Sequence, residues 1–201
     1  MYYVDRHSQG VCVPTDSRDN MIRATVDLLR ERGYAGTSLG DILARSGGPR
    51  GSIYHHFPGG KQEMVAEALR RYAAGIRRRL VAVAETGSGV DLVRALLGAM
   101  RDGLRASDFS VGCAVAGVVL DLAPFANGVD LALLTPAAEA LDGWRGVIAT
   151  ALTRDGLSKE RAQRLATLVL AAFEGAIILA RAQRSTAPLD AVEQELTVLL
   201  A

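Results

Sequence analysis

The sequence predicts an all-α fold. Its apolar residues recur at helical spacings along most of the chain, and no segment shows the convincing alternation of a β-strand. Hydrophobic residues make up 49% of the 201 residues and only 6 are prolines, so long helices can form and bury a core. We expect about nine helices, three in an N-terminal unit and six behind it.

The first helix is expected to end at Arg32, before Gly33. Asp16 or Ser17 can cap its start, because both side chains accept hydrogen bonds from free backbone N–H groups. Residues 1–15 mix polar and aromatic side chains without a period, so we expect a flexible arm there.

The second helix is expected over about residues 39–45, with N-cap chemistry from Thr37 and Ser38. Residues 46–48, Ser-Gly-Gly, end it. Pro49 suits the first position of a third helix, because that position needs no N–H donor. Two short helices joined by a glycine-containing turn are typical of the helix-turn-helix, whose second helix enters the DNA major groove.

The third helix is expected to be amphipathic, with Ile53 and Phe57 on its buried side. Its other side carries Arg50, Ser52, Tyr54 and His55. Arg50 can donate two hydrogen bonds to a guanine, Tyr54 can contact a thymine methyl or a phosphate, and Gly51 lets the backbone approach DNA closely. The alternative is a solvated helix face.

Six further helices are expected at 61–84, 90–105, 115–122, 136–155, 159–184 and 189–200, with a loop at 123–135. Lys61 starts the first of them, where Gly59 and Gly60 offer no capping side chain. An ammonium group beside free helix N–H groups predicts a phosphate-binding site. The alternative is a lysine extended into water.

Charge is divided unevenly along the chain, although the formal net charge is only +1. Residues 1–80 hold 13 Lys and Arg against 8 Asp and Glu, whereas residues 81–201 hold 10 against 14. A basic N-terminal part with an acidic remainder fits one end that faces nucleic acid.

Two cysteines, Cys12 and Cys113, imply no disulfide framework and suit a reducing cytoplasm. Residues 1–15 lack the basic start and apolar stretch of a secretory signal. The most apolar run, residues 166–182, contains Glu174, so we expect a buried or interface helix rather than a membrane span.

The N-terminal unit resembles the DNA-binding domain of the TetR family of transcriptional regulators. The matching motifs are the turn Gly33-Tyr34-Ala35-Gly36-Thr37, the run Gly51-Ser52-Ile53-Tyr54-His55-His56-Phe57, and Lys61. The resemblance covers roughly residues 17–72. The sequences Gly-Gly-Pro-Arg-Gly-Ser and Pro-Gly-Gly and the pair Gly112-Cys113 are similar to the LmrA/YxaF-like branch of that family.

This resemblance implies an N-terminal three-helix DNA-binding domain with a helix-turn-helix at 16–60, followed by a helical ligand-binding and dimerisation domain at 61–201. It implies a cytoplasmic transcriptional regulator, a repressor that binds a palindromic double-stranded DNA operator as a homodimer and is released by an unknown small-molecule effector. In the family, positions matching Thr37, Ser52, Tyr54, His55 and Lys61 commonly touch phosphate or base. The full set of candidate DNA-binding residues is Thr37, Ser38, Pro49, Arg50, Gly51, Ser52, Tyr54, His55 and Lys61.

Candidate effector-binding residues are spread over separate helices of the second part, where aromatic and aliphatic side chains can line an apolar cavity. They are Met100, Leu104, Phe109, Cys113, Val118, Asp121, Phe125, Trp144, Phe173 and Glu174. The alternative is an ordinary core. Glu174 stands in an apolar run, so it can pair with an arginine, bond across a dimer or face an effector. Cys113 has no basic neighbour in sequence to lower its pKa, which favours packing over a redox switch.

The last two helices can form the dimer seam. Their apolar stripes are Leu165, Leu168, Val169, Ala172, Ala176 and Leu179, then Leu189, Val192, Leu196 and Leu199. The alternative is a core within one chain.

Metal and enzyme chemistry are not indicated. His55 and His56 are adjacent, so on a helix they point about 100° apart, and no cysteine or carboxylate cluster lies near them in sequence. The chain has no phosphate-binding glycine loop, no nucleophile-elbow motif and no cluster with metal-ligand spacing, and we expect no cofactor. The alternatives to a DNA-binding regulator are an enzyme or a helical adaptor without sequence-specific DNA binding.

Overall fold

The computed structural model describes residues 17–48, 53–122 and 130–200. These residues form α1 (Ser17–Arg32), α2 (Leu39–Ser46), α3 (Ile53–His56), α4 (Gly60–Thr86), α5 (Gly89–Ala106), α6 (Ala114–Leu122), η2 (Asp130–Leu133), α7 (Leu134–Arg154), α8 (Lys159–Gln183) and α9 (Ala187–Leu200). No strand occurs in these ranges, and the prediction of an all-α fold is confirmed.

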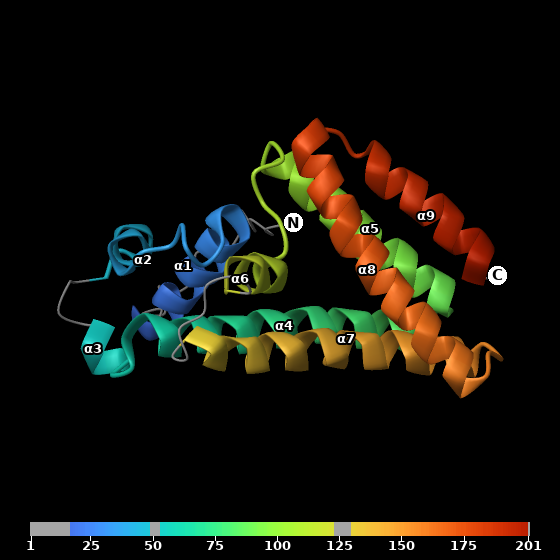
Figure 1. Ribbon diagram of the computed structural model, residues 1–201, viewed down its shortest axis with the longest axis horizontal. Coiled ribbons are helices and arrows are strands. Elements are labelled where there is room, and N and C mark those ends of the chain that lie inside the picture. The colour runs from blue at the N-terminus through green and yellow to red at the C-terminus, as the bar shows by residue number, and fades with distance from the viewer. Residues whose placement is uncertain (1–16, 49–52, 123–129, 201) are drawn as a thin grey trace, which may run out of the picture.

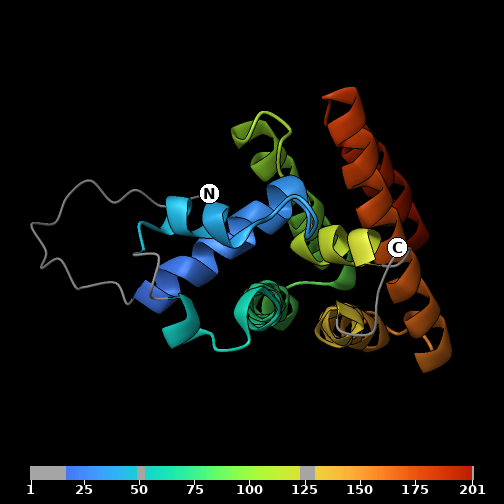
Figure 2. The same cartoon turned by 60° about the vertical axis from the view of Figure 1, so that its left-hand side comes forward.

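The helices form two groups that are joined by α4 (Figure 1). The short α2 and α3 lie with α1 at one end of the molecule, next to the start of α4. The long α4 and α7 run side by side, and Arg154 at the end of α7 donates hydrogen bonds to the carbonyls of Ala84 and Gly87 at the end of α4. Helices α5, α8 and α9 pack together, and α6 contacts both α1 and α7 (Figure 2).

Serine side chains cap the starts of three helices, and the cap at Ser38 confirms the prediction for the second helix. The Ser38 hydroxyl accepts from the Asp41 N–H at 3.1 Å, and the Asp41 carboxylate accepts from the Ser38 N–H at 3.0 Å. The Ser38 hydroxyl also donates to the Asp41 carboxylate at 2.6 Å, and this bond together with the one from the Ser38 N–H lowers the pKa of the Asp41 carboxyl. Ser88 and Asp91 form the same capping box at α5, and Ser158 caps α8.

Several helix ends differ from the prediction. Helix α4 continues to Thr86 and α5 starts at Gly89, so the turn between them is shorter than expected. Helix α7 starts at Leu134 rather than at Pro136, because the first turn of a helix tolerates a proline. The expected N-terminal arm, residues 1–15, lies outside the described ranges.

The apolar core is continuous from the N-terminal helices α1, α2 and α3 into the remaining helices, α4 to α9, which form the body of the protein. Ile53 and Phe57, the predicted inner side of the third helix, are 3% and 0% exposed, so this prediction is confirmed. The Arg18 guanidinium lies 4.9 Å from the centre of the Phe57 ring. Truncating a buried phenylalanine to alanine typically costs about 3–5 kcal/mol, so Phe57 anchors the short α3 to the rest of the protein.

Candidate functional site

The outer side of α3 carries the described part of the predicted DNA-binding face. Tyr54 is 66% exposed and His55 is also exposed, whereas Ile53 on the same helix is buried. The rings of His55 and His56 meet edge to face, with centroids 5.0 Å apart. Exposed tyrosine and histidine side chains can contact phosphates or base edges in a groove. Four further candidates, whose contacts stay predictions, lie outside the described residues: Pro49, Arg50, Gly51 and Ser52.

Lys61 stands at the start of α4 and contacts the turn after α1. Its Nζ donates to the Tyr34 carbonyl at 2.8 Å and lies 3.9 Å from the centre of the Tyr34 ring. The Glu63 carboxylate accepts from the Gly59 N–H at 2.8 Å, and no side chain caps the first turn of α4. Lys61 therefore joins α4 to the turn after α1, and its contact with a phosphate stays a prediction.

The Thr37 side chain does not cap α2, because Ser38 is the N-cap residue. Thr37 is 1% exposed, its hydroxyl donates to the Gly33 carbonyl at 2.7 Å, and its N–H donates to the Tyr34 carbonyl at 3.2 Å. In this arrangement the Thr37 side chain closes the turn after α1 and does not face solvent, and a contact of Thr37 with DNA stays a prediction. Ser38, which is exposed, caps α2 without it.

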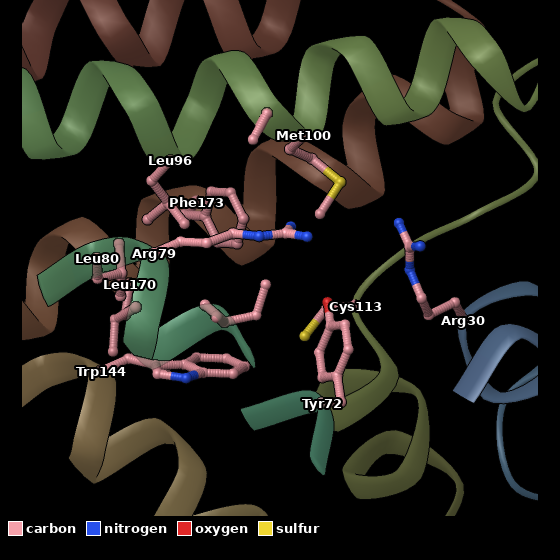
Figure 3. A pocket seen from close by; sticks show the side chains of 12 residues that line it. Arg30, Tyr72, Arg79, Leu80, Leu96, Met100, Cys113, Trp144, Leu170 and Phe173 are labelled. Atoms are coloured by element: carbon pink, nitrogen blue, oxygen red, sulfur yellow. The ribbon is translucent and has the colours of Figure 1, made fainter. Parts of the chain in front are cut away.

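A cavity of about 100 Å³ lies among α4, α5, α7 and α8 (Figure 3). Four of the predicted effector-binding residues line it, namely Met100, Cys113, Trp144 and Phe173. The Trp144 Nε1–H donates to the Ala73 carbonyl at 3.0 Å, and its ring meets Tyr72 edge to face at a centroid distance of 6.1 Å. A largely apolar cavity with a few polar groups is the usual form of a small-molecule site.

The predicted set missed Tyr72, Ile76 and Arg79 of α4 and Arg30 of α1, which also line the cavity. The helical spacing of Tyr72 and Ile76 places them on one apolar side of α4, and that pattern could have pointed to both. Arg79 belongs to a basic run of the same helix. A sequence pattern does not distinguish an arginine that faces water from one that turns over a cavity.

Other predicted residues lie away from the cavity lining. Leu104 and Val118 are fully buried and belong to the core, the alternative considered for them. Phe109 lies after α5, with the Arg184 guanidinium 5.9 Å from the centre of its ring. Phe125 lies outside the described residues.

Glu174 lies in a separate cleft of about 260 Å³, which shares Arg30 and Cys113 with the cavity. Its Oε1 is buried without a hydrogen-bond partner among the described residues, and burial raises the pKa of its carboxyl. Burial also raises the pKa values of Cys113 and Tyr72, whose side chains lie next to each other. Cys113 is therefore a protonated thiol and a weak nucleophile, which supports packing over redox sensing. No group of three or more potential metal-ligating acidic, His or Cys side chains occurs in the part of the chain that the structure describes.

A set of polar contacts joins the N-terminal helices to the body. Arg30 and Gly112 bond twice: the Gly112 N–H donates to the Arg30 carbonyl at 2.8 Å, and the Arg30 Nε donates to the Gly112 carbonyl at 3.2 Å. Arg181 of α8 donates to the Glu31 carbonyl at 3.2 Å. The Asp121 carboxylate accepts from the Ala35 N–H at 2.8 Å, so Asp121 belongs to this junction and not to the cavity.

Helices α8 and α9 carry most of the large apolar side chains that are exposed in the described part of the chain. They are Leu168, Ile178, Leu179, Val198 and Leu199. The predicted seam is partly wrong, because Val169, Ala176, Leu189 and Leu196 are buried within the chain. By length and composition α8 could cross a membrane, but its apolar residues divide between this core and the exposed side.

A helix-turn-helix whose second helix exposes Tyr54 and His55, joined to further helices that enclose a cavity, defines the class of DNA-binding regulators with a second helical domain. Two family models match the chain: "Bacterial regulatory proteins, tetR family" over residues 21–68, and "Transcriptional regulator LmrA/YxaF-like, C-terminal domain" over residues 89–195. The chain therefore belongs to the TetR family of transcriptional regulators, in its LmrA/YxaF-like branch, and both predictions are confirmed.

Similar proteins agree with this assignment. The HTH-type transcriptional regulator Rv0196 of Mycobacterium tuberculosis is 37% identical over 91% of this chain and 93% of its own length. LmrA of Bacillus subtilis, also an HTH-type transcriptional regulator, is 31% identical over 87% of this chain and 91% of its own. A TetR regulator from Legionella pneumophila has the same fold, with a TM-score of 0.81 at 17% identity over 90% of this chain and 96% of its own. These relatives and both family models are transcriptional regulators and not enzymes.

Proposed function

We propose that this regulator is a repressor that binds a palindromic operator as a homodimer in the cytoplasm and leaves it when a small molecule enters the cavity. The observation that carries the proposal is the path of α4. The helix begins directly after the helix-turn-helix formed by α2 and α3, where Lys61 contacts Tyr34. Three turns later it lines the cavity with Tyr72, Ile76 and Arg79. One rigid element therefore touches both sites, so a ligand that favours one tilt of α4 changes the position of α3.

We propose residues 16–60 as the DNA-binding domain and residues 61–201 as the effector and dimerisation domain. Within the first, Arg50, Tyr54 and His55 are the proposed DNA contacts: Arg50 for base recognition, and the other two for phosphate or base edges. Thr37 and Lys61 are proposed supports of this domain, because the Thr37 hydroxyl and the Lys61 Nζ both donate to backbone carbonyls in the turn after α1. Support for the DNA partner comes from the structure of CifR with a 26-base-pair operator, whose fold matches this chain with a TM-score of 0.72 over 90% of this chain and 95% of that one.

The exposed apolar side of α8 and α9 is the proposed dimer seam. Ile178 and Leu179 are 55% and 51% exposed, and Gly175 beside them leaves room for close approach of a second helix. Monomeric proteins rarely leave contiguous apolar patches of this kind uncovered. Two copies joined here would present two α3 helices to successive grooves, as a palindromic site requires.

Selection of bound duplexes from random DNA tests the proposal. We expect a palindromic motif, with an affinity that falls steeply as salt concentration rises, because phosphate contacts release counterions. Arg50→Ala should relax one base position at a cost of about 1–3 kcal/mol, whereas Arg94→Ala, an exposed arginine on α5, should leave binding unchanged. A chain that binds no duplex at low salt would refute DNA binding, and a motif without two-fold symmetry would refute the homodimer.

A further inference from the structure

The opening of the cavity is cationic. The lining contains two arginines, Arg30 and Arg79, and no Asp or Glu from the described residues. A wider space of about 460 Å³ shares both arginines and Tyr72 with the cavity, so the two spaces adjoin there. The wider space has one acid in its described lining, Asp27, against three arginines. The pair of spaces thus forms a small apolar chamber with a positively charged mouth.

Neither of the two shared arginines is neutralised by a described acid. Arg79 forms no hydrogen bond or ion pair with another described residue, and the Arg30 Nε donates to a neutral carbonyl, that of Gly112. Arg71, the third arginine of the wider space, is already paired with Asp19 at 2.5 Å and Glu67 at 3.1 Å. In Figure 3 the Arg79 side chain extends past Phe173 in the direction of Arg30. Two guanidinium groups facing one partly apolar space repel each other, and an anion between them would remove that repulsion.

Building on the proposed effector-controlled repressor, we propose that the effector is a small organic carboxylate. Its carboxylate group binds between Arg79 and Arg30, because guanidinium groups bind carboxylates through paired, charge-assisted hydrogen bonds. Its apolar end enters the chamber against Trp144 and Phe173. The chamber is smaller than the roughly 150 Å³ cavity that accommodates benzene, so the part it encloses is at most about the size of one ring.

The position of Arg30 gives this ligand class a direct route to the DNA-binding unit. Arg30 lies in the last turn of α1, and its carbonyl and side chain both bond to Gly112 at the junction with the body. A carboxylate that draws the Arg30 guanidinium toward Arg79 competes with the bond to the Gly112 carbonyl. Ligand binding therefore acts on α1 itself, in addition to any tilt of α4. The size of the effect is set by how much better the ligand binds the shifted arrangement.

Direct binding tests the ligand class. Trp144 is the only tryptophan of the chain and lies in the cavity, so its fluorescence reports occupancy. The probes are hexanoate and benzoate, each compared with its primary amide. We expect each carboxylate to bind about tenfold or more tightly than its amide, and Arg79→Met to abolish that preference. The matched control is Arg78→Met, an exposed arginine one position earlier, which should keep it. Equal affinities of acid and amide, or no response to either carboxylate, would overturn the proposal.

Operator release tests the route through Arg30. Fluorescence anisotropy of a labelled duplex from the selection should fall on addition of carboxylate but not amide. Arg30→Met should still bind carboxylate, weakened by about tenfold, yet lose most of the release, and Arg30→Lys should restore part of it. If wild-type protein binds no duplex, the proposed function itself fails. If it binds duplex but the amide releases it as well as the carboxylate does, the function stands and the carboxylate assignment is refuted.

Discussion

Gly117 sets how closely the DNA-binding unit approaches the body. A Cβ at this position of α6 would lie 2.9 Å from the Leu29 carbonyl oxygen and 3.3 Å from the Gly33 Cα, both in or just after α1. These are backbone atoms, so they cannot rotate away. Gly117→Ala must therefore push α1 and α6 apart at the same junction where Asp121 binds the Ala35 N–H.

The magnitude follows from a matched pair of variants. Gly146 lies on the exposed side of α7, and a Cβ there meets nothing within 4 Å. Gly146→Ala should stabilise the protein by about 0.5–1 kcal/mol, because alanine restricts the unfolded chain and favours helix. Gly117→Ala has the same helical gain, so the difference between the two variants isolates the packing cost, which we expect to be about 1–3 kcal/mol.

Urea unfolding followed by circular dichroism, at one protein concentration for all samples, measures this difference. Operator affinity is the second measurement, because a displaced α1 also moves α3. We expect Gly117→Ala to weaken operator binding and Gly146→Ala to leave it unchanged. Equal stability of the two variants would show that α1 and α6 can separate at no cost, which contradicts the close contact.

Three further predictions concern the seam, the buried acid and the lysine. Leu179→Glu should give a monomer by sedimentation and lower operator affinity, since it places a charge in the proposed seam; an intact dimer would contradict that seam. Glu174→Gln should reduce the pH dependence of stability. The pKa of the Glu174 carboxyl is raised, so the folded protein holds the proton more tightly than the unfolded chain, and wild-type stability falls as pH rises above about 4.5. Unfolding curves of the variant should show a smaller fall over the same pH range. Lys61→Met should cost about 1–2 kcal/mol of stability, measured by thermal or urea unfolding, because the contacts with Tyr34 are lost. Unchanged stability together with weaker binding to every DNA sequence would instead make Lys61 a phosphate contact.

Local signals in the sequence were enough for most of the helices. Ser38 marks a helix start because an N-cap depends on the next three residues only. The buried side of α3 was also predictable, since Ile53 and Phe57 are one helical turn apart.

The predicted site was less complete because its contacts join distant parts of the chain. Lys61 finds its partner 27 residues away, and Asp121 finds its partner 86 residues away. Arg30 and Arg79 line one cavity only because α1 and α4 pack together. Spacing along a helix gives the direction of a side chain relative to its own helix, but not the neighbour that it meets.

Helix α8 carries part of the proposed dimer seam and also one of the contacts that attach the N-terminal helices. Ile178 and Leu179 lie on the exposed side of α8, and Arg181, within the next turn, donates to the Glu31 carbonyl of α1. No loop lies between these residues of α8, so the distance between the two α3 helices of the proposed dimer should be nearly fixed. A single base pair inserted at the centre of the palindrome turns one half-site by about 35° around the duplex. A dimer this rigid should bind the altered operator weakly, so the spacing of the half-sites would be recognised as strongly as their base sequence.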